Sequence, residues 1–450
     1  MSATIVLDIG KTNVKLVLLN SEGDTLATRR MPNVPATDGP YPHHDTERIW
    51  HWLLDTVRGL AGMAQVSAIV PVTHGATAAL VDDAGLVLPV ADYEYEPPPA
   101  QTAHYAALRP AYADTHSPQL PAGLNLGRQL AWLAGAYPEA FGRARRILMY
   151  PQYWAWRLCG VAASEVTSLG CHTDLWQPAR QQYSALVAHM GWGGLFPPLQ
   201  PAWAPLGAIT PEVAGYTGLP RDCQVICGIH DSNASLLRHL HSGGEPLTVL
   251  STGTWVIAAA IGQPLEQLRE EADMLANSNA LGQPVACMRF MGGREFGELA
   301  GAEPQVCGVQ DLQDLIAQGT MALPCYSAAG GPFAGRAGRI EGPPPQGKQQ
   351  AYALATLYCV LMSDYCLTAL GAAGPVVVEG SYTDNPHFAP LLAALRPQQS
   401  VSSSADTSGT TCGGWMLHHW GQAPQAGGTA ATPLHLPGWQ AYRQRWLETL

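Results

Sequence analysis

Positive charge is scarce in this sequence. Charged residues make up 13% of the 450 positions, and 24 lysines and arginines stand against 35 aspartates and glutamates. The net charge of −11 argues against a general nucleic-acid binder, which needs a basic face to neutralise phosphates. Two short basic clusters, Arg29-Arg30 and residues 143–146, are typical of a solvated surface. We therefore expect no nucleic-acid partner.

Three other patterns are missing. The ten cysteines are scattered without a CxxC pair, no run of 18 apolar residues occurs, and no signal-like segment precedes the first apolar run. Scattered thiols are typical of a reducing cytoplasm, and the lack of a long apolar run argues against a membrane span. We therefore expect a cytoplasmic protein that has no membrane partner.

The remaining composition is that of a folded globular protein, with 47% hydrophobic residues. A chain of this length exceeds one ordinary core, so two domains are expected. A polar, glycine-bearing break at residues 241–244 is the natural boundary. The prediction is a first domain at residues 1–242 and a second at residues 243–450.

The first chemical motif is a short turn between two predicted strands, residues 4–7 and 14–19. The turn lacks the GxxxxGK[ST] pattern of a P-loop. Its backbone N–H groups and the Thr12 hydroxyl can bind an anion, and Asp8 at the strand end can hold a hydrated Mg²⁺. An ordinary tight hairpin is the alternative interpretation.

The second motif is Asp231, which follows the apolar run 223–229 and precedes a predicted helix at residues 234–240. We expect the helix dipole to lower the pKa of this carboxyl and to favour its ionised form. An ionised carboxylate in this place can act as a general base. A simple N-cap by Asp231 or Ser232 is the alternative.

The third motif, Ser251–Thr254, again lies between two apolar runs, residues 247–250 and 255–260. This weak echo of the N-terminal hairpin predicts two turns that hold a nucleotide phosphate chain. His74 ends a predicted strand and could touch a substrate hydroxyl, although a structural role is as compatible with its position. Residues 92–94 are either a substrate-facing loop or an acidic connector.

These landmarks, in this order, resemble the FGGY family of carbohydrate kinases, within the actin/hexokinase/Hsp70-like superfamily. Residues 8–12 are similar to the family's first phosphate hairpin, and residues 130–139 to its helix with the pattern L-x-W followed by PE. Residues 205–220 are similar to the segment that leads into the catalytic aspartate, and residues 228–235 to that aspartate's own segment. The resemblance covers nearly the whole chain.

The resemblance implies an α/β protein with two ribonuclease-H-like (actin-like ATPase) domains and a central cleft, which binds ATP, Mg²⁺ and a small-molecule sugar. It implies catalysis by Asp231, metal binding by Asp8, and substrate contacts from His74, Gly75, His230 and Asp231. It implies ATP contacts from Gly10, Thr12, Asn13, Lys15, Ser251, Thr252, Gly253, Thr254, Gly380, Asn385, Gly413 and Gly414. The late glycines are expected in turns where an adenine can lie flat against the backbone, and ordinary turn chemistry is the alternative.

The sequence departs from the family pattern at three places near the expected site. Lys11 stands where many members have a small residue, Asp92-Tyr93-Glu94 stands where a D-x-R pattern is expected, and Glu379-Gly380-Ser381 replaces a fuller glycine run. The sugar contacts around residues 92–94 and the adenosine contacts around Gly380 are therefore the least determined part of the resemblance.

The His230-Asp231 pair is similar to rhamnulose kinases and, more loosely, to fuculose kinases. That likeness implies a 6-deoxy-ketohexose such as L-rhamnulose or L-fuculose. A pentulose or polyol kinase and a non-catalytic kinase-like sugar sensor are the alternatives. The sequence does not give the exact sugar, the hydroxyl that is phosphorylated, the pathway or the oligomeric state, although a homodimer is compatible with such a kinase.

Overall fold

The computed structural model describes residues 2–240, 246–328, 330–404, 409–422 and 428–450, and the chain forms two compact units. Unit 1 comprises residues 1–242, 276–284 and 408–424, and unit 2 comprises residues 243–275, 285–407 and 425–450. The predicted boundary between residues 242 and 243 lies outside the described residues. A single boundary at this point does not account for residues 276–284 and 408–424, which belong to unit 1.

The core of unit 1 is a mixed sheet in the order β11-β12-β5-β1-β2-β3. Its strands are β1 (Ser2–Ile9), β2 (Asn13–Leu19), β3 (Thr25–Pro32), β5 (Gln65–Thr73), β11 (Pro205–Ala208) and β12 (Gln224–Ile226), and β13 (Ile229–His230) pairs with the end of β5. The hairpin β1–β2 and its neighbour β3 are antiparallel, whereas β5 runs parallel to β1 and to β12.

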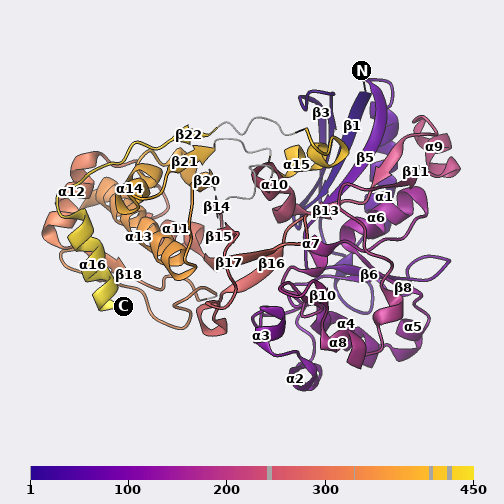
Figure 1. The fold of residues 1–450 in the computed structure, drawn as a ribbon, viewed down its shortest axis with the longest axis horizontal. Helices are drawn as coiled ribbons and strands as arrows, with labels where there is room; N and C mark the ends of the chain where they lie inside the picture. Colours follow the sequence, from indigo (N-terminus) through magenta and orange to yellow (C-terminus); the bar gives the residue numbers. More distant parts are fainter. Residues whose placement is uncertain (1, 241–245, 329, 405–408, 423–427) are drawn as a thin grey trace. The chain divides into compact units, whose positions relative to one another are not determined.

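Both faces of this sheet are buried, because alternate side chains of one strand enter two different cores. Ile5 and Leu7 join the core beneath α1 (Thr46–Leu60), α6 (Tyr150–Cys159) and α9 (Pro211–Thr217), whereas Val6 joins the core beneath α10 (Asp231–Leu240) and α15 (Gly409–His418). Figure 1 shows α15, in the yellow of the C-terminal sequence, beside α10 and β1.

A third core in unit 1 lies among short elements. They are β4 (His43–His44), β6 (Ala78–Val81), β7 (Val90–Ala91), β8 (Arg146–Met149), β9 (Trp176–Gln177), β10 (Gln182–Tyr183), α2 (Pro99–Leu108), α3 (Tyr112–Thr115), α4 (Leu126–Ala136), α5 (Pro138–Gly142), α7 (Val166–Leu169) and α8 (Ala185–His189). Strand β7, which pairs with β4, ends directly before the segment at residues 92–94.

The second sheet has the order β16-β17-β15-β14-β20-β21-β22, in which β16 (Leu275–Ser278) is an edge strand and the other six strands repeat the order of the sheet in unit 1. The strands are β14 (Leu247–Thr252), β15 (Val256–Ile261), β17 (Pro284–Phe290), β20 (Val376–Gly380), β21 (Val401–Ser404) and β22 (Thr429–Ala430). The hairpin β14–β15 and its neighbour β17 are antiparallel, β20 is parallel to β14 and to β21, and β22 is antiparallel. The strand directions therefore match those of unit 1 one by one, and the predicted echo of the N-terminal hairpin is confirmed.

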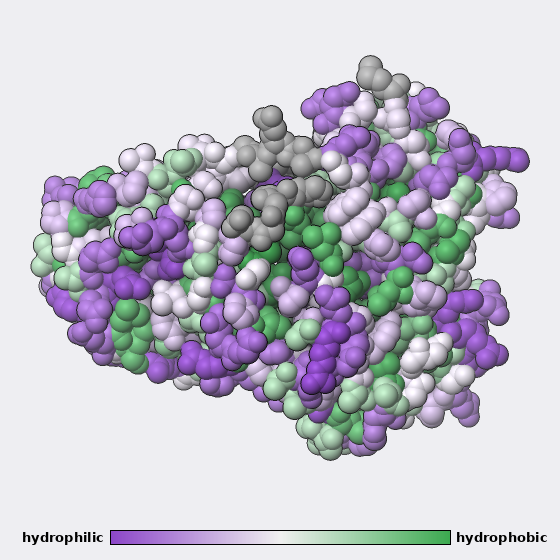
Figure 2. All heavy atoms as spheres, viewed as in Figure 1, coloured by the Kyte–Doolittle hydropathy of each residue, from purple (hydrophilic) through white to green (hydrophobic). Residues whose placement is uncertain are grey.

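The helices of unit 2 pack around α13 (Gly347–Ala369), which contacts α11 (Gly292–Ala300), α12 (Val309–Gln318) and α14 (Phe388–Leu395). Helix α13 is long and apolar enough to span a membrane, but 83% of its most apolar 18-residue stretch is buried inside the protein. In Figure 2 hydrophilic side chains cover much of the visible face of unit 2, as expected when the apolar helix lies inside. Short β18 (Met321–Leu323), β19 (Arg339–Glu341) and the terminal α16 (Trp439–Thr449) complete the unit.

Candidate active site

The first predicted turn is a tight hairpin in unit 1, as expected from the sequence. Strand β1 pairs with β2 from Thr4–Leu19 to Ile9–Val14, and the Gly10 N–H donates to the Asn13 carbonyl at 2.9 Å. Asn33 on the neighbouring segment fixes the turn, because its Nδ2 donates to the Gly10 carbonyl at 2.7 Å. The side chains of Thr12 and Asn13 remain exposed. The turn is therefore rigid and open to solvent at the atoms proposed for phosphate.

Asp8 lies at the end of β1, buried, with Lys15 Nζ 2.7 Å from its Oδ2. Burial raises the pKa of the Asp8 carboxyl, and the neighbouring Lys15 opposes part of that rise. Among the residues that the structure describes, no group of three or more His, Cys, Asp or Glu side chains could enclose a metal. A single carboxylate fits a cation that keeps most of its water shell, as Mg²⁺ usually does.

Asp231 begins α10, directly after β13 has brought it to the edge of β5. Its Oδ1 lies 3.2 Å from His230 Nε2 and accepts the Ser232 N–H at 2.6 Å. His230 Nδ1 in turn faces Asn233 Nδ2 at 3.2 Å. His230 Nε2 also faces Cys171 Sγ at 3.9 Å, so its approach to Asp231 is a close contact beside the carboxylate and not a hydrogen bond. The predicted contact of His230 with sugar stays a prediction.

The expected direction of the Asp231 pKa was wrong. Burial raises this pKa, and attraction to His74 and the hydrogen bonds from Ser232 offset only part of the rise. The helix-dipole argument considered one helix alone, whereas desolvation comes from the elements packed around it. Burial also lowers the pKa of His230 to about 4, so its imidazole is neutral at pH 7.

His74 and Gly75 follow β5 and lie against this pair. The His74 N–H donates to the Ile9 carbonyl at 2.9 Å, which ties the end of β5 to the end of β1. A Cβ on Gly75 would lie 2.9 Å from His230 Nε2, so glycine is needed for the imidazole to fit. His74 Nδ1 faces the Gly75 carbonyl at 3.0 Å, while its buried Nε2 has no hydrogen-bond partner among the described residues.

Three aromatic side chains surround His74, and sequence analysis missed two of them, His44 and Tyr150, while it named Tyr93 only within a possible substrate-facing segment. The rings of His44, Tyr93 and Tyr150 lie 5.0, 5.4 and 5.1 Å from the His74 ring. His44 is buried, and within the described part of the chain neither of its ring nitrogens has a hydrogen-bond partner. No local signal marks these residues, because they come from four separate segments of unit 1.

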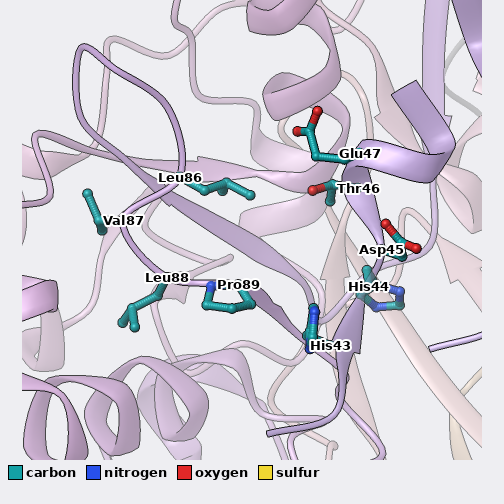
Figure 3. A pocket seen from close by; sticks show the side chains of 9 residues that line it. All are labelled: His43, His44, Asp45, Thr46, Glu47, Leu86, Val87, Leu88 and Pro89. Atoms are coloured by element: carbon teal, nitrogen blue, oxygen red, sulfur yellow. The ribbon is translucent and has the colours of Figure 1, made fainter. Parts of the chain in front are cut away.

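His44 also lines a cavity of about 280 Å³ in unit 1. Figure 3 shows residues 43–47 on one side of this cavity and residues 86–89 on the other. None of the lining residues belongs to a predicted motif, and neither His230 nor Asp231 lines the cavity.

The second predicted turn lies in unit 2 and is also a hairpin. Strands β14 and β15 pair up to Thr252–Val256, and the Gly253 N–H donates to the Trp255 carbonyl at 3.0 Å. Ser251 and Thr254 are exposed, but the Thr252 hydroxyl is buried and accepts the Tyr382 N–H at 2.9 Å. Thr252 therefore holds the hairpin against the segment after β20.

Two predicted nucleotide residues near this hairpin have clear structural partners. A Cβ on Gly380 would lie 1.9 Å from the Thr252 carbonyl oxygen, and the residue has a φ of +85°. Asn385 Nδ2 donates to the Thr356 hydroxyl at 2.9 Å, and its Oδ1 accepts the His387 N–H at 3.1 Å. Both residues shape the loop after β20, and their contacts with ATP stay predictions.

The expected turn at Gly413 and Gly414 was wrong, because both lie inside α15 and α15 belongs to unit 1. A Cβ on Gly413 would lie 2.1 Å from the Ala234 carbonyl oxygen, and one on Gly414 would lie 2.6 Å from Val6 Cγ1. These glycines let α15 approach α10 and the sheet closely. Their predicted contacts with ATP, which the family resemblance implies, stay predictions.

Two hairpins at matching places in two duplicated sheets, and a partly buried carboxylate beside the first hairpin, are features of a class of phosphotransferases. The sequence model of the FGGY family of carbohydrate kinases, N-terminal domain, matches residues 3–237, and that of the carbohydrate kinase FGGY C-terminal domain matches residues 244–426. The chain belongs to the FGGY family of carbohydrate kinases. The expected α/β fold with two actin-like ATPase domains is thereby confirmed.

Similar proteins with known names fall in the same family. The chain is 27% identical over 270 residues to the L-fuculokinase of Salmonella typhi, and the match covers 56% of this chain and 55% of that protein. It therefore spans about half the length of the curated relatives it matches.

Solved structures extend the likeness to the full length. The chain is 35% identical to a carbohydrate kinase from Novosphingobium aromaticivorans, with a TM-score of 0.92 and 99% of each chain covered. It is 16% identical to a xylulose kinase from Lactobacillus acidophilus, with a TM-score of 0.80 over 100% of this chain and 97% of that one. The second likeness shows the fold alone.

Proposed function

We propose that this protein is an ATP-dependent kinase that phosphorylates a hydroxyl of a ketose. The observation that carries the proposal is the Asp231 carboxylate, held 3.2 Å from His230 Nε2 at the end of β13. In unit 1 this carboxylate interacts electrostatically with Asp8, Lys15 and His74, and therefore adjoins the first hairpin. A base beside a phosphate-binding turn is what transfer to an alcohol requires.

In the proposed reaction Asp231 accepts the proton of the sugar hydroxyl while the hydroxyl oxygen attacks the γ-phosphorus of ATP. The bond between the γ-phosphorus and the β,γ-bridging oxygen breaks, so ADP leaves and the sugar phosphate remains. The His230 ring lies beside this carboxylate, with Nε2 3.2 Å from Asp231 Oδ1. The buried Nε2 of His74, which has no hydrogen-bond partner among the described residues, is proposed to bind a second sugar hydroxyl.

Each hairpin offers phosphate contacts of its own. In unit 1 these are the backbone of Gly10 and the side chains of Thr12, Asn13 and Lys15, and in unit 2 the exposed residues 251, 253 and 254 of the β14–β15 turn. Mg²⁺, when bound, would offset the charge that develops on the phosphate oxygens, and Asp8 would hold it through water.

For the acceptor we propose a 6-deoxy-ketohexose such as L-fuculose or L-rhamnulose. Support comes from the His230-Asp231 pair and from the 27% identity to an L-fuculokinase. A pentulose is the second candidate, because a xylulose kinase shares the fold with a TM-score of 0.80. A polyol kinase and a non-catalytic sugar sensor are further alternatives. We also propose that the enzyme acts in the cytoplasm, as its scattered thiols favour.

The test is ADP release in the presence of Mg²⁺ and ATP with a panel of L-fuculose, L-rhamnulose, L-xylulose, D-ribulose, D-xylulose and glycerol. Turnover of one deoxy-ketose above the others supports the proposal, and preferred turnover of a pentulose or glycerol replaces its substrate. ATP binding without turnover of any acceptor supports the sensor.

The matched variant is Asp231→Asn, which keeps the shape of the side chain but removes its basicity. We expect the rate to fall by about 100- to 10,000-fold, the range for loss of a positioned base. The melting temperature should stay near that of the wild type, which shows that the fold is intact. A rate within threefold of the wild type would contradict the role of Asp231.

A further inference from the structure

Lys11, which departs from the family pattern, links the first hairpin to the segment after β7. Its Nζ forms an ion pair with Asp92 and lies 3.2 Å from Glu94 Oε2. The side chains of Lys11 and Asp92 keep only 18% and 7% of their exposure, whereas Glu94 is 66% exposed. Ion pairs that are this shielded from water interact more strongly than surface pairs.

The segment that receives Lys11 is held in place by its backbone. The Asp92 N–H donates to the Pro42 carbonyl at 3.0 Å, and the Gly123 N–H donates to the Tyr93 carbonyl at 2.7 Å. Asp92 Oδ1 also accepts the Glu94 N–H at 3.1 Å. One carboxylate therefore fixes both the turn of its own segment and the ammonium group of Lys11.

This ion pair is continuous with the proposed catalytic base. Lys11 Nζ lies 4.8 Å from the centre of the Tyr93 ring, and the Tyr93 and His74 rings are 5.4 Å apart. Asp231 interacts electrostatically with both Tyr93 and His74. The residues thus form one wall of unit 1 that runs from Asp231 to Asp92.

The described charges along this wall leave no unpaired cation. Burial lowers the pKa of His44 and of His74, which favours the neutral form of both imidazoles. The two lysines of the wall, Lys11 and Lys15, are each in an ion pair. A more distant cation, Arg30, weakly attracts Asp8. The negative charges are the carboxylates of Asp8, Asp92, Glu94 and Asp231. A carboxylate on the acceptor would meet repulsion here without a compensating positive charge.

We propose that the Lys11–Asp92 ion pair determines acceptor specificity, so that the site takes an uncharged polyhydroxyl substrate and rejects a sugar acid. This inference rests on the proposed kinase function. It assigns the residues by which the site would distinguish an uncharged acceptor from a sugar acid. The long lysine side chain is needed because it must span from the phosphate hairpin to residues 92–94. Its ammonium group, neutralised by Asp92, orders the wall without attracting an anion.

The test compares D-gluconate with D-glucitol, which differ by a carboxylate in place of a hydroxymethyl group. Each is titrated directly against the full-length protein and is also measured as an inhibitor of phosphorylation of the best ketose. The wild type should bind D-glucitol at least tenfold more tightly than D-gluconate. Asp92→Asn leaves Lys11 with only the exposed carboxylate of Glu94, so its charge is no longer fully neutralised and the ratio should shift about tenfold toward D-gluconate.

The matched control is Asp83→Asn, the same substitution in an exposed ion pair of unit 1, where Asp83 lies 3.5 Å from Arg146 and is 86% exposed. It should leave the ratio unchanged. An equal ratio in the wild type and Asp92→Asn, or wild-type binding of D-gluconate as tight as that of D-glucitol, overturns the inference. These titrations do not need turnover, so they remain decisive if no ketose is phosphorylated, an outcome that would count against the proposed function instead.

A second variant, Lys11→Met, tests the assignment of Lys11 to the acceptor side. We expect the KM for the ketose to rise about tenfold, because the wall loses its anchor, while the KM for ATP changes less than twofold. A selective rise in the KM for ATP would instead make Lys11 a nucleotide contact and overturn the inference. Melting temperatures of both variants within a few degrees of the wild type show that the fold is retained.

Discussion

At the scale of single residues, the candidate site depends on how one imidazole is held. His230 Nδ1 lies 3.2 Å from Asn233 Nδ2, and Nε2 lies 3.2 Å from Asp231 Oδ1. Burial raises the pKa of Asp231, and the hydrogen bonds from Ser232 offset part of that rise. We expect the polar edge of the neighbouring imidazole to contribute to the pH at which the base becomes active.

The pH dependence of the rate tests this role. Asp231 must be ionised to accept a proton, so kcat should fall as the pH drops through its raised pKa. His230→Phe places an apolar ring beside the carboxylate, so the pKa of Asp231 should rise further and the acid limb of the kcat profile should move to higher pH. His230→Gln, which keeps a polar group there, should move the limb less. Identical limbs in all three proteins would show that His230 does not act through Asp231.

Residue identities near the base could be predicted from sequence, but their interactions could not. The position of Asp231 after an apolar run indicates its place at a strand end, and β13 confirms that place. Its pKa depends on burial by elements far away in the sequence, so a rule about the adjacent helix gave the wrong direction. Lys11 and Asp92 are 81 positions apart, and no local pattern pairs them.

At the scale of elements, the two hairpins were predictable because each consists of two apolar runs around a small polar turn. Whether the late glycines lie in a turn or in a helix could not be predicted, because both a turn and a closely packed helix favour glycine. Gly414 in α15 illustrates this ambiguity, because its neighbour in space is Val6 of β1, over 400 positions earlier. Only the tertiary contact distinguishes the two interpretations.

Substitution of Gly414 tests the packing of α15. In Gly414→Leu the new side chain must displace Val6, and we expect a loss of roughly 1–3 kcal/mol or more, as in overpacked cores. Thermal unfolding measured by circular dichroism would report this loss as a lower melting temperature. The control is Gly59→Ala in α1, where a Cβ meets nothing within 4 Å. Equal melting temperatures for Gly414→Leu and wild type would contradict the close contact.

At the scale of the whole molecule, duplication explains why the fold class could be predicted. Both sheets carry the same order of antiparallel and parallel neighbours, so each hairpin occupies the equivalent place in its unit. The division of the chain was harder to predict, because residues 276–284 and 408–424 join unit 1 from within the second half of the sequence. Sequence order alone gives no sign of such returns.

Nucleotide binding should be visible in the stability of the whole molecule. If ATP binds only the folded state, ATP at 100 times its Kd should stabilise the protein by about 2.7 kcal/mol. A rise in melting temperature should appear in the wild type and equally in Asp231→Asn, because Asp231 contacts the acceptor in the proposed reaction. Absence of the rise in both proteins would contradict the nucleotide contacts proposed for the two hairpins.

The return of α15 to unit 1 also has a consequence for synthesis. One apolar face of the first sheet, which includes Val6 and Val72, is covered by Trp415 and Met416 of this helix. A growing chain produces that face almost at once but makes its cover only after residue 409 has been translated. The half of the protein that leaves the ribosome first is therefore completed late, since α10 alone covers this face of the sheet until α15 has been made.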